Sequence, residues 1–154
     1  MNKNLEELIM KRVIFVLVAV IGFCFSAYAG KPKSFVKHTD GGEWSAIQIR
    51  EDLSFDKAFN EILDVVAKRF EMDMISKEGA YCRSNWCYTW NVKGKYLNYY
   101  RARVVFKFSA DRTKVEIKTE AEYLTKSGWL KGFDSRLLQT MKQDISGVVG
   151  RTVM

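Results

Sequence analysis

The sequence predicts an α+β fold, a two-layer sandwich in which two helices cover one face of a curved antiparallel sheet of about five strands. The chain has 154 residues and a globular composition, with 47% hydrophobic and 14% aromatic residues. Two segments repeat apolar residues at helical spacing, and two others alternate apolar and charged residues as a half-exposed strand does. One apolar stripe on each helix and one apolar sheet face are best buried against each other.

Two helices are expected. Ser54 is a good N-cap for a first helix at 55–70, in which apolar residues recur at helical spacing. Asp134 is expected to cap a last helix, and Phe133 before it can pack on Leu138 as a hydrophobic staple. Each helix would therefore begin at a defined residue and turn one apolar face to the sheet.

Strands are expected at 44–50, 72–83, 86–93, 99–108 and 114–123. The last two show the clearest alternation, with apolar residues on one face and charged residues on the other, as in a sheet that is half exposed to water. Residues 125–132 are expected to form a loop that carries Trp129. The predicted order is β-α-β-β-β-β-α, and no repeat or linker divides this part of the chain.

Residues 1–29 have the pattern of a secretory signal peptide. Lys11 and Arg12 precede an apolar run at 13–25, and small residues at Ala27 and Ala29 provide a cleavage site. Cleavage after Ala29 removes three of the 25 basic and two of the 18 acidic residues. The remaining chain has 22 basic and 16 acidic residues, a formal charge of +6, and is expected to be exported, either to a periplasm or out of the cell.

The expected organisation is a signal peptide at 1–29, a flexible basic lead-in at 30–42 and a single α+β domain at 43–154. A retained anchor is an alternative, although the apolar run of 13 residues is shorter than the roughly 20 that a membrane-spanning helix needs. Lipid attachment at Cys24 is another, although the bulky Phe23 precedes it. Translation can start at Met1 or at Met10.

Cys82 and Cys87 are expected to form a disulfide in an oxidising compartment. A two-residue turn at 84–85 would place Arg83 opposite Trp86 and Cys82 opposite Cys87, within disulfide reach. Two sulfurs are too few for a metal site, and the short spacing of redox-active cysteine pairs is absent.

The same register places five side chains on one face of this hairpin: Tyr81, Arg83, Trp86, Tyr88 and Trp90. An aromatic ladder on a strand either packs against the helices or forms an exposed platform for a partner. Both interpretations stay open, and in the second these residues are the candidate binding surface.

A curved sheet gripped by helices can also leave a pocket between its layers. Phe59, Phe106 and Phe108 are the candidate lining of such a pocket, which would hold an apolar ligand. The alternative is that these rings fill the core, because a small domain needs its apolar area for stability.

Catalysis is not expected from this sequence. His38 is the single histidine and is predicted to be a surface residue of the lead-in, so a nucleophile lacks a histidine base. The glycines do not form a phosphate-binding pattern, and Glu120 and Glu122 belong to the charged face of a strand. No cofactor or metal is expected, and nucleic acid is not an expected ligand because acidic residues are interspersed with the basic ones.

The predicted order of elements resembles that of helix-grip and TATA-binding-protein-like folds, and with them some small bacterial envelope proteins, including accessory lipoproteins of outer-membrane barrel assembly. The resemblance lies in element order alone and assigns no residue a role. With the export signal and the basic charge, we expect a non-enzymatic binding or accessory protein of a bacterial envelope. Its partner would be an envelope protein or an anionic lipid or glycan surface; a periplasmic carrier of an apolar ligand is the alternative.

Overall fold

The computed structural model describes residues 31–40, 42–88, 90 and 97–151. The chain divides into two compact units, Met1–Lys31 and Pro32–Met154, and the second unit contains every strand and helix of the described residues. The predicted signal peptide and its cleavage site lie outside the described residues. Within the described part of the chain, no helix has the length and apolar character needed to cross a membrane.

The described part of this unit forms an antiparallel sheet of seven strands with two helices, which confirms the α+β class and corrects the expected number of strands. The strands are β1 (Phe35–Lys37), β2 (Ser45–Gln48), β3 (Met72–Ser76), β4 (Tyr81–Ser84), β5 (Tyr100–Phe108), β6 (Lys114–Thr125) and β7 (Gly128–Asp134). The helices are α2 (Phe55–Ala67) and α3 (Ser135–Val149).

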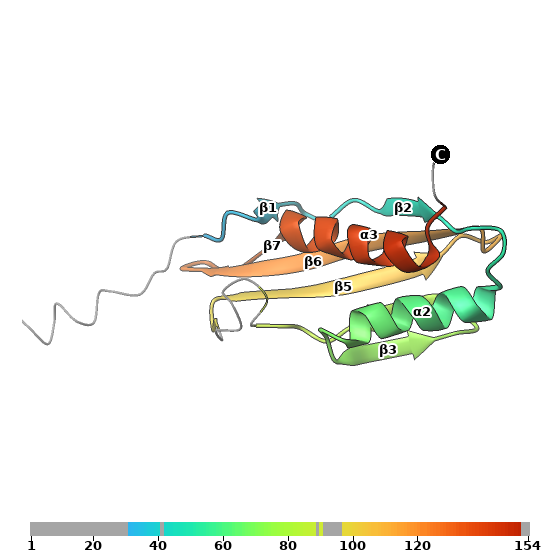
Figure 1. Ribbon diagram of the computed structural model, residues 1–154. Coiled ribbons are helices and arrows are strands. Elements are labelled where there is room, and N and C mark those ends of the chain that lie inside the picture. Colours follow the sequence, from blue (N-terminus) through green and yellow to red (C-terminus); the bar gives the residue numbers. More distant parts are fainter. Residues whose placement is uncertain (1–30, 41, 89, 91–96, 152–154) are drawn as a thin grey trace, which may run out of the picture. The chain divides into compact units, whose positions relative to one another are not determined.

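The strands follow the order β1-β7-β6-β5-β4-β3, and β2 pairs with the first part of β6. The long hairpin of β5 and β6 is the centre of the sheet, with Tyr100 opposite Tyr123 and Phe108 opposite Val115. Helices α2 and α3 lie on the same face of the sheet (Figure 1). Among the described residues, helices therefore cover one face of the sheet and none covers the other.

Alternate residues of the central strands form the core beneath the helices. Those of β5 are Tyr100, Ala102, Val104, Phe106 and Phe108, all buried. Helix α2 contributes Ala58, Phe59, Ile62, Val65 and Val66, and helix α3 contributes Leu137, Met141, Ile145 and Val149. The predicted helical stripes and the predicted apolar strand faces therefore meet in one core.

Both predicted helix caps are confirmed. Ser54 Oγ accepts a hydrogen bond from the Lys57 N–H at 3.3 Å, and Asp134 Oδ1 accepts one from the Leu137 N–H at 2.8 Å. Helix α2 ends at Ala67, earlier than predicted, because the chain then turns so that it can begin β3.

Two predictions are wrong here. The segment predicted to be a flexible lead-in contains strand β1, and most of the segment predicted to be a loop at 125–132 belongs to strand β7; the two strands pair with each other. Phe35 is 2% exposed and its ring lies 6.2 Å from that of Tyr100 and 6.1 Å from that of Tyr123. Gly132 permits this close packing, since a Cβ there would lie 2.1 Å from the Val36 carbonyl oxygen. The folded unit therefore begins before residue 43.

The predicted hairpin with its turn at 84–85 is wrong. Strand β4 pairs with β3 and with β5, so Cys82 lies opposite Ile75 on one side and Phe106 on the other. The chain reverses between β3 and β4 instead, where Ala80 adopts a positive φ of 50°. Pairing with the long strand β5 buries more of β4 than a short local hairpin would.

Candidate functional site

Cys82 and Cys87 do not form the predicted disulfide with each other. Cys82 lies opposite Phe106 and Cys87 forms a bridge with Ala102, four residues away along the same strand. Four residues of strand span about 13 Å, whereas disulfide-bonded Cα atoms lie within about 7 Å. The prediction fails because the register that supported it is not formed. Burial raises the pKa of Cys82 to about 11.

The candidate pocket residues Phe59, Phe106 and Phe108 are core residues. They are 1%, 0% and 7% exposed, and their ring centroids lie 5.9 to 6.4 Å apart. Phe55 covers Phe108 at 5.0 Å. These rings fill the space between α2 and the sheet, so they do not line an open pocket.

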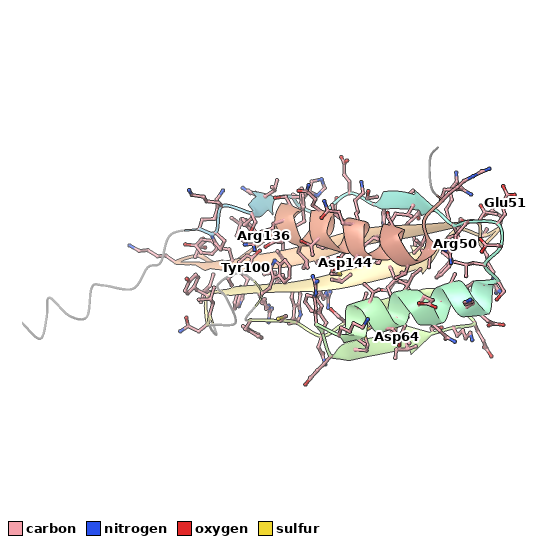
Figure 2. All side chains as sticks on the ribbon, in the orientation of Figure 1. Arg50, Glu51, Asp64, Tyr100, Arg136 and Asp144 are labelled. Carbon is pink, nitrogen blue, oxygen red and sulfur yellow. The ribbon has the colours of Figure 1, made fainter. Side chains whose placement is uncertain are left out.

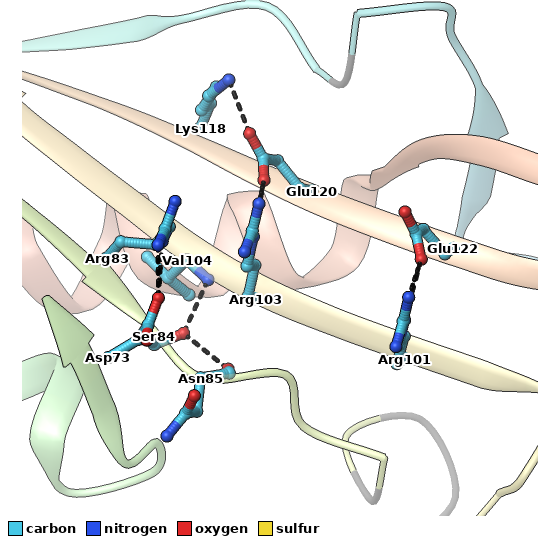
Figure 3. A network of polar contacts seen from close by, with 10 residues as sticks. All are labelled: Asp73, Arg83, Ser84, Asn85, Arg101, Arg103, Val104, Lys118, Glu120 and Glu122. Carbon is cyan, nitrogen blue, oxygen red and sulfur yellow. Dashed lines mark hydrogen bonds and ion pairs between the residues drawn. The ribbon is translucent and has the colours of Figure 1, made fainter.

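The face of the sheet opposite the helices, which we call the helix-free face, carries the charged residues of the two central strands. They are Arg101, Arg103 and Lys107 on β5, and Glu116, Lys118, Glu120 and Glu122 on β6. Each basic residue of β5 forms an ion pair with the acidic residue opposite it on β6. Figure 3 shows two of these pairs, Arg101–Glu122 and Arg103–Glu120, each with an N–O distance of 2.5 Å.

Glu120 is the most connected acidic residue of this face. Lys118 Nζ lies 2.7 Å from its second carboxylate oxygen, so two cations bind one carboxylate. Burial alone would raise the pKa of Glu120, but the hydrogen bonds from Lys118 and Arg103 outweigh burial and lower it. Glu120 therefore stays ionised and holds both cations in place.

Aromatic side chains lie over these charges. The Trp86 ring is 4.6 Å from the Arg101 guanidinium carbon and 4.3 Å from that of Arg103, while the Trp129 ring is 4.5 Å from Arg101. Arg101 Nη1 also donates a hydrogen bond to the Tyr88 hydroxyl at 3.1 Å. We call this group the Trp86 cluster: Trp86, Tyr88, Arg101, Arg103 and Trp129. It combines cation–π contacts with ion pairs on the helix-free face.

The structure separates the members of the predicted binding surface. Trp86 and Tyr88 belong to the Trp86 cluster. Tyr81 is half-buried and lies opposite Lys107, on the helix-free face. Trp90 lies elsewhere, because its ring packs against the core, 6.2 Å from that of Phe70.

Arg83 lies on the helix-free face but is not opposite Trp86 as predicted, because it pairs with Met74 and Val105. It forms an ion pair with Asp73 of the neighbouring strand, with a distance of 2.5 Å (Figure 3). The hydrogen bond to that carboxylate raises the pKa of Arg83. Sequence reasoning missed Arg101, Arg103 and Trp129, although the alternation of β5 already placed both arginines on the charged face.

An open cavity of about 310 Å³ adjoins the Trp86 cluster. Its lining includes Trp86, Arg103, Glu120, Glu122 and Lys131, with Thr39 and Asp40 from the segment after β1. An indole ring, both signs of charge and a hydroxyl are therefore available to a ligand at one place. Among the described residues, no group of three or more histidine, cysteine or acidic side chains is placed to hold a metal ion.

Comparison with known proteins does not assign a function to these residues. No protein-family model and no curated protein matches the chain. The function considered for the site therefore comes from the side chains themselves.

Proposed function

We propose that this protein is an exported, non-enzymatic binding module of a bacterial cell envelope, and that it contacts a partner protein through the helix-free face around Trp86. The observation that carries the proposal is the Trp86 cluster, in which an indole ring stacks on two arginines beside an open cavity. Tryptophan, tyrosine and arginine are the residue types that dominate protein contact surfaces.

The fixed positions of the arginine side chains in the Trp86 cluster support a binding role. Arg101 and Arg103 are held by ion pairs to the neighbouring strand, so little side-chain freedom is lost when a partner binds. A surface of this kind gains affinity because its groups are already in position before contact.

The mixture of charges favours a protein as the partner. Arg103, the arginine that lines the cavity, already forms an ion pair with Glu120, while Lys131 and Asp40 form no ion pair within the described residues and add one charge of each sign. Aromatic groups surrounded by charges of both signs match the apolar centre and polar rim of a protein interface.

The export part of this proposal rests on the pattern of residues 1–29, because the disulfide no longer supports it. We further propose a helix-grip or TATA-binding-protein-like topology. The terminal helix and the placement of both helices on one sheet face support it.

The partner-binding part is tested by cross-linking in intact cells, comparing Trp86→Ala with Trp44→Ala. Trp44 is a control on the same face, since it is 37% exposed and lies over Lys107 and Lys118 without contacting a member of the Trp86 cluster in the described cation–π pairs. We expect Trp86→Ala to reduce the recovered partner about 30-fold, the effect of a central interface residue, and Trp44→Ala to reduce it less than about threefold.

The melting temperature of each variant shows whether it is folded. Full recovery of the partner by folded Trp86→Ala, or equal losses in both variants, would contradict the proposed contact surface.

Export is tested by the intact mass of the protein recovered from the cell envelope. We expect a chain that begins at Gly30, with Cys82 and Cys87 both as thiols. A mass that retains residues 1–29, or one that includes acyl chains, would contradict this part of the proposal.

A further inference from the structure

Among the described residues of the second unit, the excess of positive charge lies in two short segments, 32–40 and 126–136. These segments contain five basic and two acidic residues, whereas the other described residues of the unit contain 14 of each. One of the two acidic residues, Asp134, is fully buried. The other described residues of the unit therefore carry no net charge, and the two segments carry the excess.

The fold brings the two segments together at the edge of the sheet. Strand β1 pairs with β7 so that Lys37 lies opposite Gly132, and the His38 N–H donates to the Lys131 carbonyl at 3.3 Å. The Ser135 N–H donates to the Ser34 carbonyl at 2.9 Å. Arg136, the next residue, lies at the same end of the sheet as Tyr100 (Figure 2). Basic residues almost 100 positions apart in sequence thus share one edge.

The side chains of this edge differ from those of the central strands. Lys33, Lys37 and Lys131 are exposed and form no ion pair within the described residues, whereas the basic residues of β5 are all paired. Val36 and Trp129 are 40% and 37% exposed, which is unusual for large apolar side chains in this structure. We call these five residues the basic edge.

We propose that the basic edge docks the protein on the surface of an anionic lipid bilayer. Lysines without acidic partners are attracted to headgroup phosphates, and tryptophan is favoured at the boundary between water and hydrocarbon. Of the three lysines, only Lys131 lines the cavity; the others lie along the edge, which suits a charged surface better than one small anion. This surface goes beyond the proposed protein contact and does not depend on it.

The test measures partitioning of the full chain onto vesicles of mixed phosphatidylglycerol and phosphatidylcholine, and onto vesicles of phosphatidylcholine alone. Both vesicles contain the same hydrocarbon, so any contribution of the apolar run at 13–25 cancels in the ratio of the two partition coefficients. We expect the anionic vesicles to be preferred, and the preference to fall as salt is added. The combined Lys33→Gln, Lys37→Gln and Lys131→Gln variant should lower that ratio about 100-fold, because each lysine near an anionic surface contributes about fivefold.

A variant with the same change in charge is the control. Lys57, Lys68 and Lys142 are exposed on and next to the helices and form no ion pair within the described residues. Changing these three to glutamine should lower the ratio less than about threefold, since charges away from the docked surface are screened by salt. Equal losses in both triple variants would show a non-specific effect of net charge and would overturn the inference.

Trp129 belongs to the Trp86 cluster as well as to the basic edge, so the variant that separates the two surfaces is Trp86→Ala. Trp129→Phe should abolish a blue shift of tryptophan fluorescence on anionic vesicles, whereas Trp86→Ala should leave the partition ratio unchanged. Equal binding of the unaltered chain to neutral and anionic vesicles would also overturn the inference, and it would leave the proposed protein contact untouched.

Discussion

At the scale of single residues, Asp134 joins three parts of the structure through one buried carboxylate. Oδ1 accepts the Leu137 N–H and so caps α3, while Oδ2 accepts hydrogen bonds from Ser34 Oγ at 2.8 Å and from the Tyr100 hydroxyl. Its backbone oxygen also accepts a hydrogen bond from Thr119 Oγ1 at 2.9 Å. The cap residue predicted from sequence therefore also ties the N-terminal segment to the centre of the sheet.

We predict that Asp134→Ala lowers the free energy of unfolding by roughly 3 kcal/mol, since the change removes a helix cap and leaves buried donors without an acceptor. Ser54→Ala, which removes the exposed cap of α2, should cost only about 1 kcal/mol. Urea unfolding of both variants measures the difference. A loss at Asp134 no larger than that at Ser54 would contradict the role of the buried network.

Tyr100 gives a prediction about alkaline pH. Burial, together with the nearby charge of Asp134, raises the pKa of Tyr100 above its ordinary value of 10.0. The folded state therefore keeps the phenol protonated, and the stability that this contributes is full below pH 10 and declines as the pH rises further, because the unfolded phenol ionises there. Unfolding between pH 9 and 11.5 should show a shallower loss of stability in Tyr100→Phe than in the unaltered chain; parallel curves would contradict this account.

The two cysteines can be distinguished chemically. Cys82 is fully buried with a pKa of about 11, so in the folded protein iodoacetamide at about pH 8 should not modify it, whereas half-buried Cys87 should react. In urea both should react. A peptide in which Cys82 and Cys87 are linked, found after digestion without a reductant, would contradict the observed register.

At the scale of elements, the attachment of β1 depends on Gly132. A Cβ at this position would meet the Val36 carbonyl oxygen at 2.1 Å and the Phe35 ring at 2.8 Å, and neither can move without opening the β1–β7 pairing. Gly132→Ala should therefore lower the free energy of unfolding by about 2 kcal/mol or more. Gly147→Ala is the matched control, because nothing lies within 4 Å of a Cβ there and alanine favours a helix, so it should stabilise by about 0.5–1 kcal/mol.

Urea unfolding of the two glycine variants should thus give changes of opposite sign. Stabilisation by Gly132→Ala would show that β1 is not packed as the structure places it.

The elements that sequence predicted well are those whose pattern is local and long. Helices α2 and α3 and strands β5 and β6 each repeat their apolar residues over nine or more positions, so one face of each had to be buried. The short strands β1 and β7 pair across almost 100 residues, and the glycine that admits their pairing resembles a loop residue in the sequence. The pairing of β1 with β7 depends on contacts between distant residues, so it could not be predicted from the local sequence of either strand.

The same limit applies to the candidate site. The sequence correctly placed Arg83 and Trp86 on one face. It also predicted that they pair with each other across a turn at 84–85, whereas β4 pairs with β5, which is more distant in sequence. That pairing determines which cations Trp86 meets, so Arg101 and Arg103 replace the expected Arg83. The alternation along a strand determines which face of the sheet a side chain lies on. The register between strands determines which side chains of the neighbouring strand it contacts.

At the scale of the whole folded unit, the two faces of the sheet differ in the side chains that they carry. The helix face is filled by apolar side chains, which stabilise the fold. The helix-free face neutralises its own central charges through ion pairs and presents the Trp86 cluster with its cavity, while the basic edge lies where β1 pairs with β7. In this proposal the protein contact around Trp86 and the membrane contact at the basic edge adjoin at Trp129 and Lys131.

The most direct test of the central claim places a photo-reactive amino acid at one exposed position on each face and irradiates intact cells. Thr39 lines the cavity beside Trp86, and Gln139 is an exposed residue of α3 on the opposite side of the sheet. The proposed contact predicts a cross-linked protein from the position of Thr39 and none from that of Gln139. Cross-linking from the position of Gln139 alone would show that the partner binds the helix layer and would contradict the account.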